Sequence, residues 1–386
     1  MGESQHGPAV IGTTRNAGDT IAVHFLEEGG QQPAEVAVWI ATFIAGAHET
    51  LNLAVYDCRL SAEPAGILRE ALHDRLRAGV RIRLVYDSGD KPQSGAGMDA
   101  MGAEPAERDT HERVKEFALP DECLRAVHGE RALMHHKYLI RDQQAVWTGS
   151  LNFSDDSFAR MENIAVALAS PKLAGHFDRD FSQLWLTREI ANSGAFPTEP
   201  DRLRFDGDPA PTDVDFAPGQ GHQINEWVAE KLSHARRRIV LCSMLINSSK
   251  VLSALLTQLD RGDVKVSGVY DHTQMAGVLD QWREIPDLAW KIEAVERVVR
   301  EGRLAGKHSR PYRPGQSHNF MHNKTVVVDD TVITGSFNLS HNARENAENM
   351  LAIESPALAA EVVAYTSRLA SRFVEEPSTS PAGENG

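Results

Sequence analysis

One stretch of this sequence occurs twice, and that repeat constrains the fold more than any other feature. The first copy runs from Met134 to Ser154 and contains MHHKYLIRD and GSLNFS. The second copy runs from Met321 to Ser340 and contains MHNKTVVVD and GSFNLS. Such a repeat indicates internal duplication, so we expect two similar halves. We also expect the two copies to meet and to form one active site.

Each copy is predicted to form a β-hairpin, because residues that favour strands flank a polar turn. Side chains alternate between the two faces of a strand, so each histidine shares a face with the lysine two positions later. These pairs are His135 with Lys137 and His322 with Lys324. The four residues are the predicted catalytic group.

The aspartate of each copy is predicted to be structural. Asp142 and Asp329 lie at an odd offset from their histidines, which places them on the opposite face of a regular strand. Gly149 and Gly335 are expected to let another backbone segment approach closely.

The returning strand of each hairpin carries candidate phosphate-binding residues. Ser150 and Asn152 share a face in the first copy, as Ser336 and Asn338 do in the second, and can meet the histidine and lysine across the hairpin. Lysine supplies positive charge, and amide and hydroxyl groups supply neutral donors, so the set suits a tetrahedral oxyanion. Histidine can act there as a nucleophile or as a proton donor.

A glutamate–asparagine pair follows each copy at the same spacing, Glu162-Asn163 and Glu348-Asn349. A carboxylate that accepts the Nδ1 hydrogen of an imidazole fixes the tautomer and leaves Nε2 free to react. We therefore predict that Glu162 and Glu348 orient the histidines.

The doubled combination of H-x-K-x4-D, G-S-x-N and E-N resembles the phospholipase D superfamily. The resemblance covers most of residues 20–375 and implies an α/β fold of two similar α/β/α lobes, related by a pseudo-twofold axis, with the active site at their interface. It also implies phosphoryl transfer through a phosphohistidine. By the same resemblance His135 is the nucleophile and His322 the general acid, although sequence symmetry alone cannot assign the two roles.

By this resemblance the chain looks like a soluble phospholipase D-type phosphodiesterase that hydrolyses or transfers the phosphatidyl group of phospholipids. Contact with a membrane is expected to be peripheral. The alternatives are a metal-independent nuclease of the same superfamily, for which nucleic acid is the substrate, and a binding scaffold without activity. A scaffold could lose a motif histidine or lysine and still fold, whereas both copies are intact here.

Charge and hydropathy narrow these alternatives. A net charge of −14 argues against a general nucleic-acid binder, which usually has a basic surface. The balance reverses between Arg303 and Lys324, where a basic cluster could attract an anionic substrate or could be a solvated loop. The longest apolar run, residues 36–47, is too short to span a bilayer, and no signal peptide is apparent, so a cytoplasmic protein is expected.

Neither a metal nor another cofactor is expected. His318 and His322 have the spacing of two ligands on a helix. Pro311, Pro314 and Gly315 disfavour a helix there, and no cysteine or carboxylate lies at ligand spacing.

Periodicity predicts the same β-α-β order in both halves, with parallel strands and a right-handed crossover. The predicted divisions are a tail (1–18), a first lobe (19–189), a linker rich in Pro, Asp and Gly (190–218), a second lobe (219–375) and a disordered tail (376–386). Two insertions, residues 88–107 and 277–299, are expected to select the substrate. Trp282 and Trp290 in the second insertion either contact substrate or pack in the core.

Overall fold

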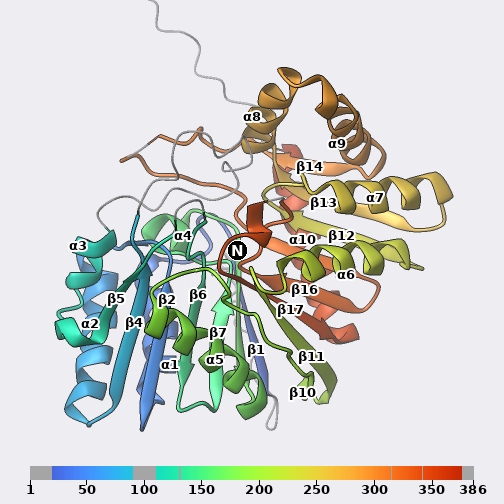
Figure 1. Cartoon of the computed structure of the whole chain (residues 1–386). Helices are drawn as coiled ribbons and strands as arrows, with labels where there is room; N and C mark the ends of the chain where they lie inside the picture. The colour runs from blue at the N-terminus through green and yellow to red at the C-terminus, as the bar shows by residue number, and fades with distance from the viewer. Residues whose placement is uncertain (1–19, 90–109, 130–131, 314, 341, 376–386) are drawn as a thin grey trace, which may run out of the picture.

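The computed structural model describes residues 20–89, 110–129, 132–313, 315–340 and 342–375, and these form two similar α/β halves (Figure 1). Both predicted tails and most of the insertion at 88–107 lie outside the described residues. The first half is blue to green in Figure 1, and the second is yellow to red. The predicted fold class is confirmed.

The first half is built on a seven-stranded sheet with the order β1-β9-β7-β6-β2-β4-β5. Its strands are β1 (Ile21–Leu26), β2 (Thr50–Val55), β4 (Arg81–Asp87), β5 (Leu124–Val127), β6 (Lys137–Arg141), β7 (Ala145–Gly149) and β9 (Asn163–Ala169). Two short strands, β3 (Cys58–Arg59) and β8 (Phe153–Ser154), pair separately.

The second half is built on an eight-stranded sheet with the order β10-β11-β17-β16-β15-β12-β13-β14. Its strands are β10 (Asp201–Phe205), β11 (Asp208–Ala217), β12 (Arg238–Ser243), β13 (Lys265–Asp271), β14 (Leu304–Lys307), β15 (Lys324–Val328), β16 (Thr331–Gly335) and β17 (Glu348–Glu354). From β11 onward the order and the strand directions repeat those of the first sheet. The predicted hairpins are β6–β7 and β15–β16, and the predicted parallel pairs are β2–β4 and β12–β13.

The helices cover the sheets from outside and fill the space between the halves. They are α1 (Pro33–Ala45), α2 (Ala62–Arg77), α3 (Thr110–Lys115), α4 (Asp155–Ala159), α5 (Pro171–Thr187), α6 (Gly221–Ser233), α7 (Ser249–Arg261), α8 (His272–Arg283), α9 (Ala289–Glu301) and α10 (Pro356–Glu375). Apolar residues of α1 and α2 form the outer core of the first half, and those of α6 to α9 form the outer core of the second. Residues of α5 and α10 share a central core with both sheets, so the two halves are packed into one body.

The segment predicted as a linker contains two strands of the second sheet, β10 and β11. β11 pairs with β17 as β1 pairs with β9, so the second repeat begins inside residues 190–218. Every second side chain of β11 is buried, namely Ala210, Thr212, Val214 and Phe216. This alternation is the ordinary signal of a strand, but the intervening prolines and aspartates give the segment the composition of a loop. The division at a linker stays a prediction.

The second insertion is helical and forms most of α8 and α9. Trp282 is only 1% exposed and belongs to the outer core, so it packs rather than binds substrate. Trp290 is 43% exposed on the surface of α9. No helix within the described parts of the chain is long and apolar enough to cross a membrane.

The two motif glycines allow a close approach of backbones, as expected. Gly149 has a φ of 152°, and an added Cβ would lie 2.1 Å from the carbonyl oxygen of Ile164 in β9. At Gly335 the equivalent contact, with the carbonyl oxygen of Asn349, would be 2.3 Å. A side chain at either position must therefore displace the neighbouring strand.

We expect Gly149→Ala to lower the free energy of unfolding by about 2–4 kcal/mol, because β9 must shift to admit the methyl group. Gly175→Ala is the matched control, since its Cβ would meet nothing within 4 Å and alanine favours a helix. Urea denaturation measures both variants. Equal midpoints for the two would show that the close approach costs nothing.

Candidate active site

The two hairpins deliver their histidines to the junction between the halves. β6 begins at Lys137 and β15 begins at Lys324, so each histidine lies just before a buried strand. The backbone of the first motif also pairs with the second half, because His135 N–H donates to the carbonyl oxygen of Ala347 (3.0 Å). Ala347 N–H in turn donates to the carbonyl oxygen of Leu133 (2.8 Å).

His135 is completely buried and is oriented by a carboxylate from the other half. Its Nδ1 lies 2.7 Å from the carboxylate of Glu348, at the start of β17. Its Nε2 has no hydrogen-bond partner among the described residues. The ring also lies edge-on to the buried Tyr56, with centroids 4.6 Å apart. This imidazole is fixed on one side and free on the other, as a nucleophile requires.

His322 is equally buried but has a different Nδ1 partner. Its Nδ1 lies 3.1 Å from Oδ1 of Asn163, at the start of β9 in the first half. Its Nε2 likewise has no hydrogen-bond partner within the described part of the chain. Glu162 was predicted to orient a histidine, but its carboxylate instead binds Nζ of Lys307 (2.6 Å) and the backbone N–H of Glu28 (3.3 Å). A buried carboxylate needs a compensating charge, and Lys307 supplies it.

The lysines place both histidines in one electrostatic environment. Nζ of each lysine donates to the carbonyl oxygen of its own histidine, at 2.6 Å in both motifs. Burial, followed by the charges of Lys137 and Lys324, holds the pKa of His135 and of His322 well below its ordinary range. Since both lysines act on both rings, the four predicted catalytic residues share one site.

Glu348 has a carboxyl group of unusual proton affinity. Burial raises its pKa to about 8, although the positive charges of Lys137 and Lys324 and the donors Ser336 and Asn346 oppose this. Burial therefore favours the protonated carboxyl group of Glu348 beside His135. The position of this proton decides whether Nε2 of His135 carries a lone pair or a hydrogen.

The motif serines hold the partners of the histidines instead of reaching across their own hairpins. Ser150 Oγ donates to Oδ1 of Asn163 (2.7 Å), the atom that faces His322. Ser336 binds Glu348 and accepts the backbone N–H of Asn349 (3.0 Å). Both serines are fully buried, as are Asn152 and Asn338, which are 0% and 2% exposed. Phosphate binding by these four residues stays a prediction.

The motif aspartates have the contacts of structural residues. The carboxylate of Asp142 accepts the backbone N–H groups of residues 48–50, at the start of β2. The carboxylate of Asp329 accepts those of residues 236–238, at the start of β12. These bonds fasten each hairpin turn to the neighbouring strand and hold the pKa of both aspartates below its usual range, in spite of partial burial.

Sequence reasoning missed two buried aspartates that fix the approach to each histidine. Asp87 accepts the backbone N–H of Met134 (2.8 Å), and Asp271 accepts that of Met321 (2.9 Å). Asp87 is the last residue of β4, and Asp271 is the last residue of the equivalent strand β13. In the sequence, an aspartate at the end of two equivalent strands, at a similar distance before each motif, could have indicated this shared role.

His318 does not share a ligand arrangement with His322. Its Nε2 lies 3.1 Å from the backbone oxygen of Arg313, and its Nδ1 lies 3.6 Å from Asp156. Within the described ranges, no group of three or more His, Cys, Asp or Glu side chains is arranged to hold a metal ion.

A family model described as cardiolipin synthase, PLD-like domain matches residues 40–185 and 228–370, which together make up more than half of the chain. The mitochondrial cardiolipin hydrolase of Chlamydomonas reinhardtii is 27% identical over 144 residues. That match covers 37% of this chain and 54% of the hydrolase, so the chain spans about half the length of the curated relative it matches.

Two solved structures are similar over nearly the whole chain. Phosphatidylserine synthase of Haemophilus influenzae matches with a TM-score of 0.62 and 15% identity, covering 92% of this chain and 89% of that chain. Polyphosphate kinase of Porphyromonas gingivalis matches with a TM-score of 0.51 and 11% identity, covering 94% of this chain and 53% of that chain. At these identities the likeness concerns the fold.

Proposed function

This chain belongs to the phospholipase D-like family, and from that premise we propose that it is a phosphodiesterase that acts on the phosphatidyl group of phospholipids through a phosphohistidine. The observation that carries this proposal is the pair of buried imidazoles. Each has its Nδ1 engaged by the opposite half and its Nε2 without a hydrogen-bond partner in the described chain, beside two lysines.

In the proposed first step, Nε2 of His135 attacks phosphorus and the bond from phosphorus to the head-group oxygen breaks. His322 gives its Nε2 proton to the departing oxygen, so the head-group alcohol leaves and the phosphatidyl group stays bound to His135. In the second step His322 takes a proton from water, the hydroxide oxygen bonds to phosphorus, and the bond to His135 breaks. Lys137 and Lys324 stabilise the charge on the phosphoryl oxygens.

Phospholipid is the proposed substrate class for two reasons. The matching family model and the curated relative are both named for cardiolipin, a phospholipid. The net charge of −14 also disfavours a polyanionic nucleic acid, because non-specific binding to a phosphate backbone needs a basic surface. An alcohol that replaces water in the second step would give transfer instead of hydrolysis.

A substrate panel tests this proposal. Purified protein is mixed with vesicles of phosphatidylcholine, phosphatidylglycerol or cardiolipin, or with single-stranded DNA, and the products are measured by mass spectrometry. We expect release of a head-group alcohol from at least one phospholipid, at a rate that rises with the lipid surface presented, and no such release by His135→Ala. Cleavage of DNA with a steep salt dependence, without any cleavage of phospholipid, would contradict the proposal.

A further inference from the structure

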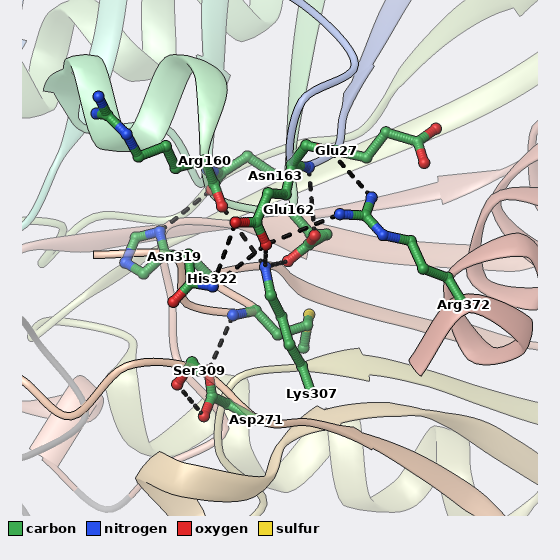
Figure 2. A network of polar contacts seen from close by, with 12 residues as sticks. Glu27, Arg160, Glu162, Asn163, Asp271, Lys307, Ser309, Asn319, His322 and Arg372 are labelled. Atoms are coloured by element: carbon green, nitrogen blue, oxygen red, sulfur yellow. Dashed lines mark hydrogen bonds and ion pairs between the residues drawn. The ribbon is translucent and has the colours of Figure 1, made fainter. Parts of the chain in front are cut away.

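A network of charged groups near His322 joins the two halves, and its central pair, Lys307 and Glu162, is buried (Figure 2). Lys307, at the end of β14, is 3% exposed, and its Nζ lies 2.6 Å from Glu162 and 2.9 Å from Glu28. Glu28 is also bound by Nδ2 of Asn319 (3.2 Å) and lies 3.8 Å from Arg372. The carboxylate of Glu162, which follows the first motif, is therefore paired with Lys307 of the second half.

The other half-site has no such lysine at the equivalent position. In the second sheet Lys307 is the register partner of Asp271, and in the first sheet the register partner of Asp87 is Val127. Val127 is completely buried and apolar. Glu348, the counterpart of Glu162, binds Nδ1 of His135. One glutamate, Glu162, is therefore paired with a lysine, whereas its counterpart Glu348 is paired with a histidine.

We propose that Lys307 is a positioning residue that withholds Glu162 from His322, so that the two histidines receive different Nδ1 partners and take different roles. His135 faces Glu348, whose ionised form makes Nε2 of His135 the more basic and nucleophilic of the two. His322 faces the neutral amide oxygen of Asn163, which makes its imidazolium the stronger acid and suits a proton donor. As a division of catalytic labour, this inference rests on the proposed function.

Several groups act on the ionisation of His322. Burial, followed by the charges of Lys324 and Lys137, lowers its pKa, the backbone of Ser150 opposes this, and Arg59 from β3 adds a smaller lowering effect. The charge of His322 also lowers the pKa of His135, so the two rings interact. If Glu162 lost Lys307, its carboxylate would be the main new influence on the pKa of His322. A negative charge near an imidazole favours the protonated form and raises its pKa.

The first experiment measures the ionisation of His322 directly, in the intact chain. NMR of protein labelled at the histidine ring carbons follows each imidazole against pH, and the His322 signal is assigned by its loss in His322→Ala. We expect Lys307→Met to raise the pKa of His322 by about one or more, because Glu162 loses its partner. Lys307→Arg should restore the wild-type value.

Arg372→Gln is the matched control, because it removes a positive charge that binds Glu28, the other carboxylate of the network. It should leave the pKa of His322 unchanged. A folded Lys307→Met with an unchanged His322 pKa would overturn the proposal.

Glu162→Gln keeps the proposal testable if Lys307→Met does not fold. If Lys307 already withholds the carboxylate, this variant should barely alter the pKa of His322. A fall of about one or more would show that Glu162 already acts on His322, and the proposal would be wrong.

A kinetic measurement separates this inference from the proposed function. A natural diester requires the proton donor, whereas a nitrophenyl diester does not. The pH break seen only with the natural diester should move upward in Lys307→Met by the amount that NMR finds, and the nitrophenyl profile should stay unchanged. If the pH break in the rate with the natural diester does not move with the pKa of His322, His322 is not the proton donor. Absence of any diesterase activity in the wild type would overturn the proposed function, and the NMR result would still decide whether Lys307 withholds Glu162.

Discussion

His322→Ala is expected to reduce the turnover of natural phosphodiesters by about 10²- to 10⁴-fold. The same variant should still release a burst of nitrophenol from a nitrophenyl diester. A nucleophile is needed for every substrate, but a proton donor matters little when the leaving oxygen departs as a stable anion. After the burst the phosphoryl group should stay on His135, because His322 is also the base that activates water. Rapid-mixing absorbance measures the burst, and mass spectrometry of peptides locates the adduct.

His135→Ala should show neither burst nor adduct, with a loss of about 10⁴-fold or more on every substrate. His234→Ala, at an exposed helix end, controls for changes that any histidine substitution could cause. If the adduct is found on His322 and the burst survives in His135→Ala, the two roles are reversed. The asymmetry of the Nδ1 partners favours the assignment made here.

The second large effect concerns Glu348 and pH. With a nitrophenyl diester, the rate of the burst should rise as pH increases and level off above about 8, the pKa to which burial raises Glu348. The sign follows from the tautomer. The ionised carboxylate accepts the Nδ1 hydrogen and leaves a lone pair on Nε2 of His135, whereas the protonated carboxyl donates to Nδ1 and leaves the hydrogen on Nε2, which cannot attack.

Glu348→Gln should slow the burst by about 10- to 100-fold and remove this pH dependence, because an amide keeps the shape but does not titrate. Glu162→Gln is the same substitution in the other half and should keep the profile, since Lys307 already occupies that carboxylate. Identical losses in the two variants would show that both glutamates serve histidines. A burst rate independent of pH between 6 and 9 would show that Glu348 does not control His135.

Periodicity in the sequence determined the local structure and the duplication. The predicted hairpins, parallel pairs and flanking helices are all present, because the pattern of buried side chains along a strand or helix is carried by neighbouring residues. The structural role predicted for Asp142 and Asp329 agrees with their contacts, but both lie in the hairpin turns beyond the strands, so the odd offset along a regular strand was not the reason. β10 and β11 were missed because they lie in the predicted linker, where prolines and aspartates hid the alternation of β11.

The sequence also determined which residue types the site contains, but tertiary structure alone decided how they are paired. Glu162 and Glu348 occupy equivalent positions in the repeat and were assigned the same role. In the fold Glu348 binds a histidine 213 positions away, whereas Glu162 binds a lysine 145 positions away. We infer that the difference comes from Lys307, which lies outside both motifs and reaches Glu162 only when β13 and β14 pair, whereas Val127 holds the equivalent register position in the first sheet. Periodicity describes which face a residue occupies. The partner that neutralises a buried charge is set by packing between distant segments.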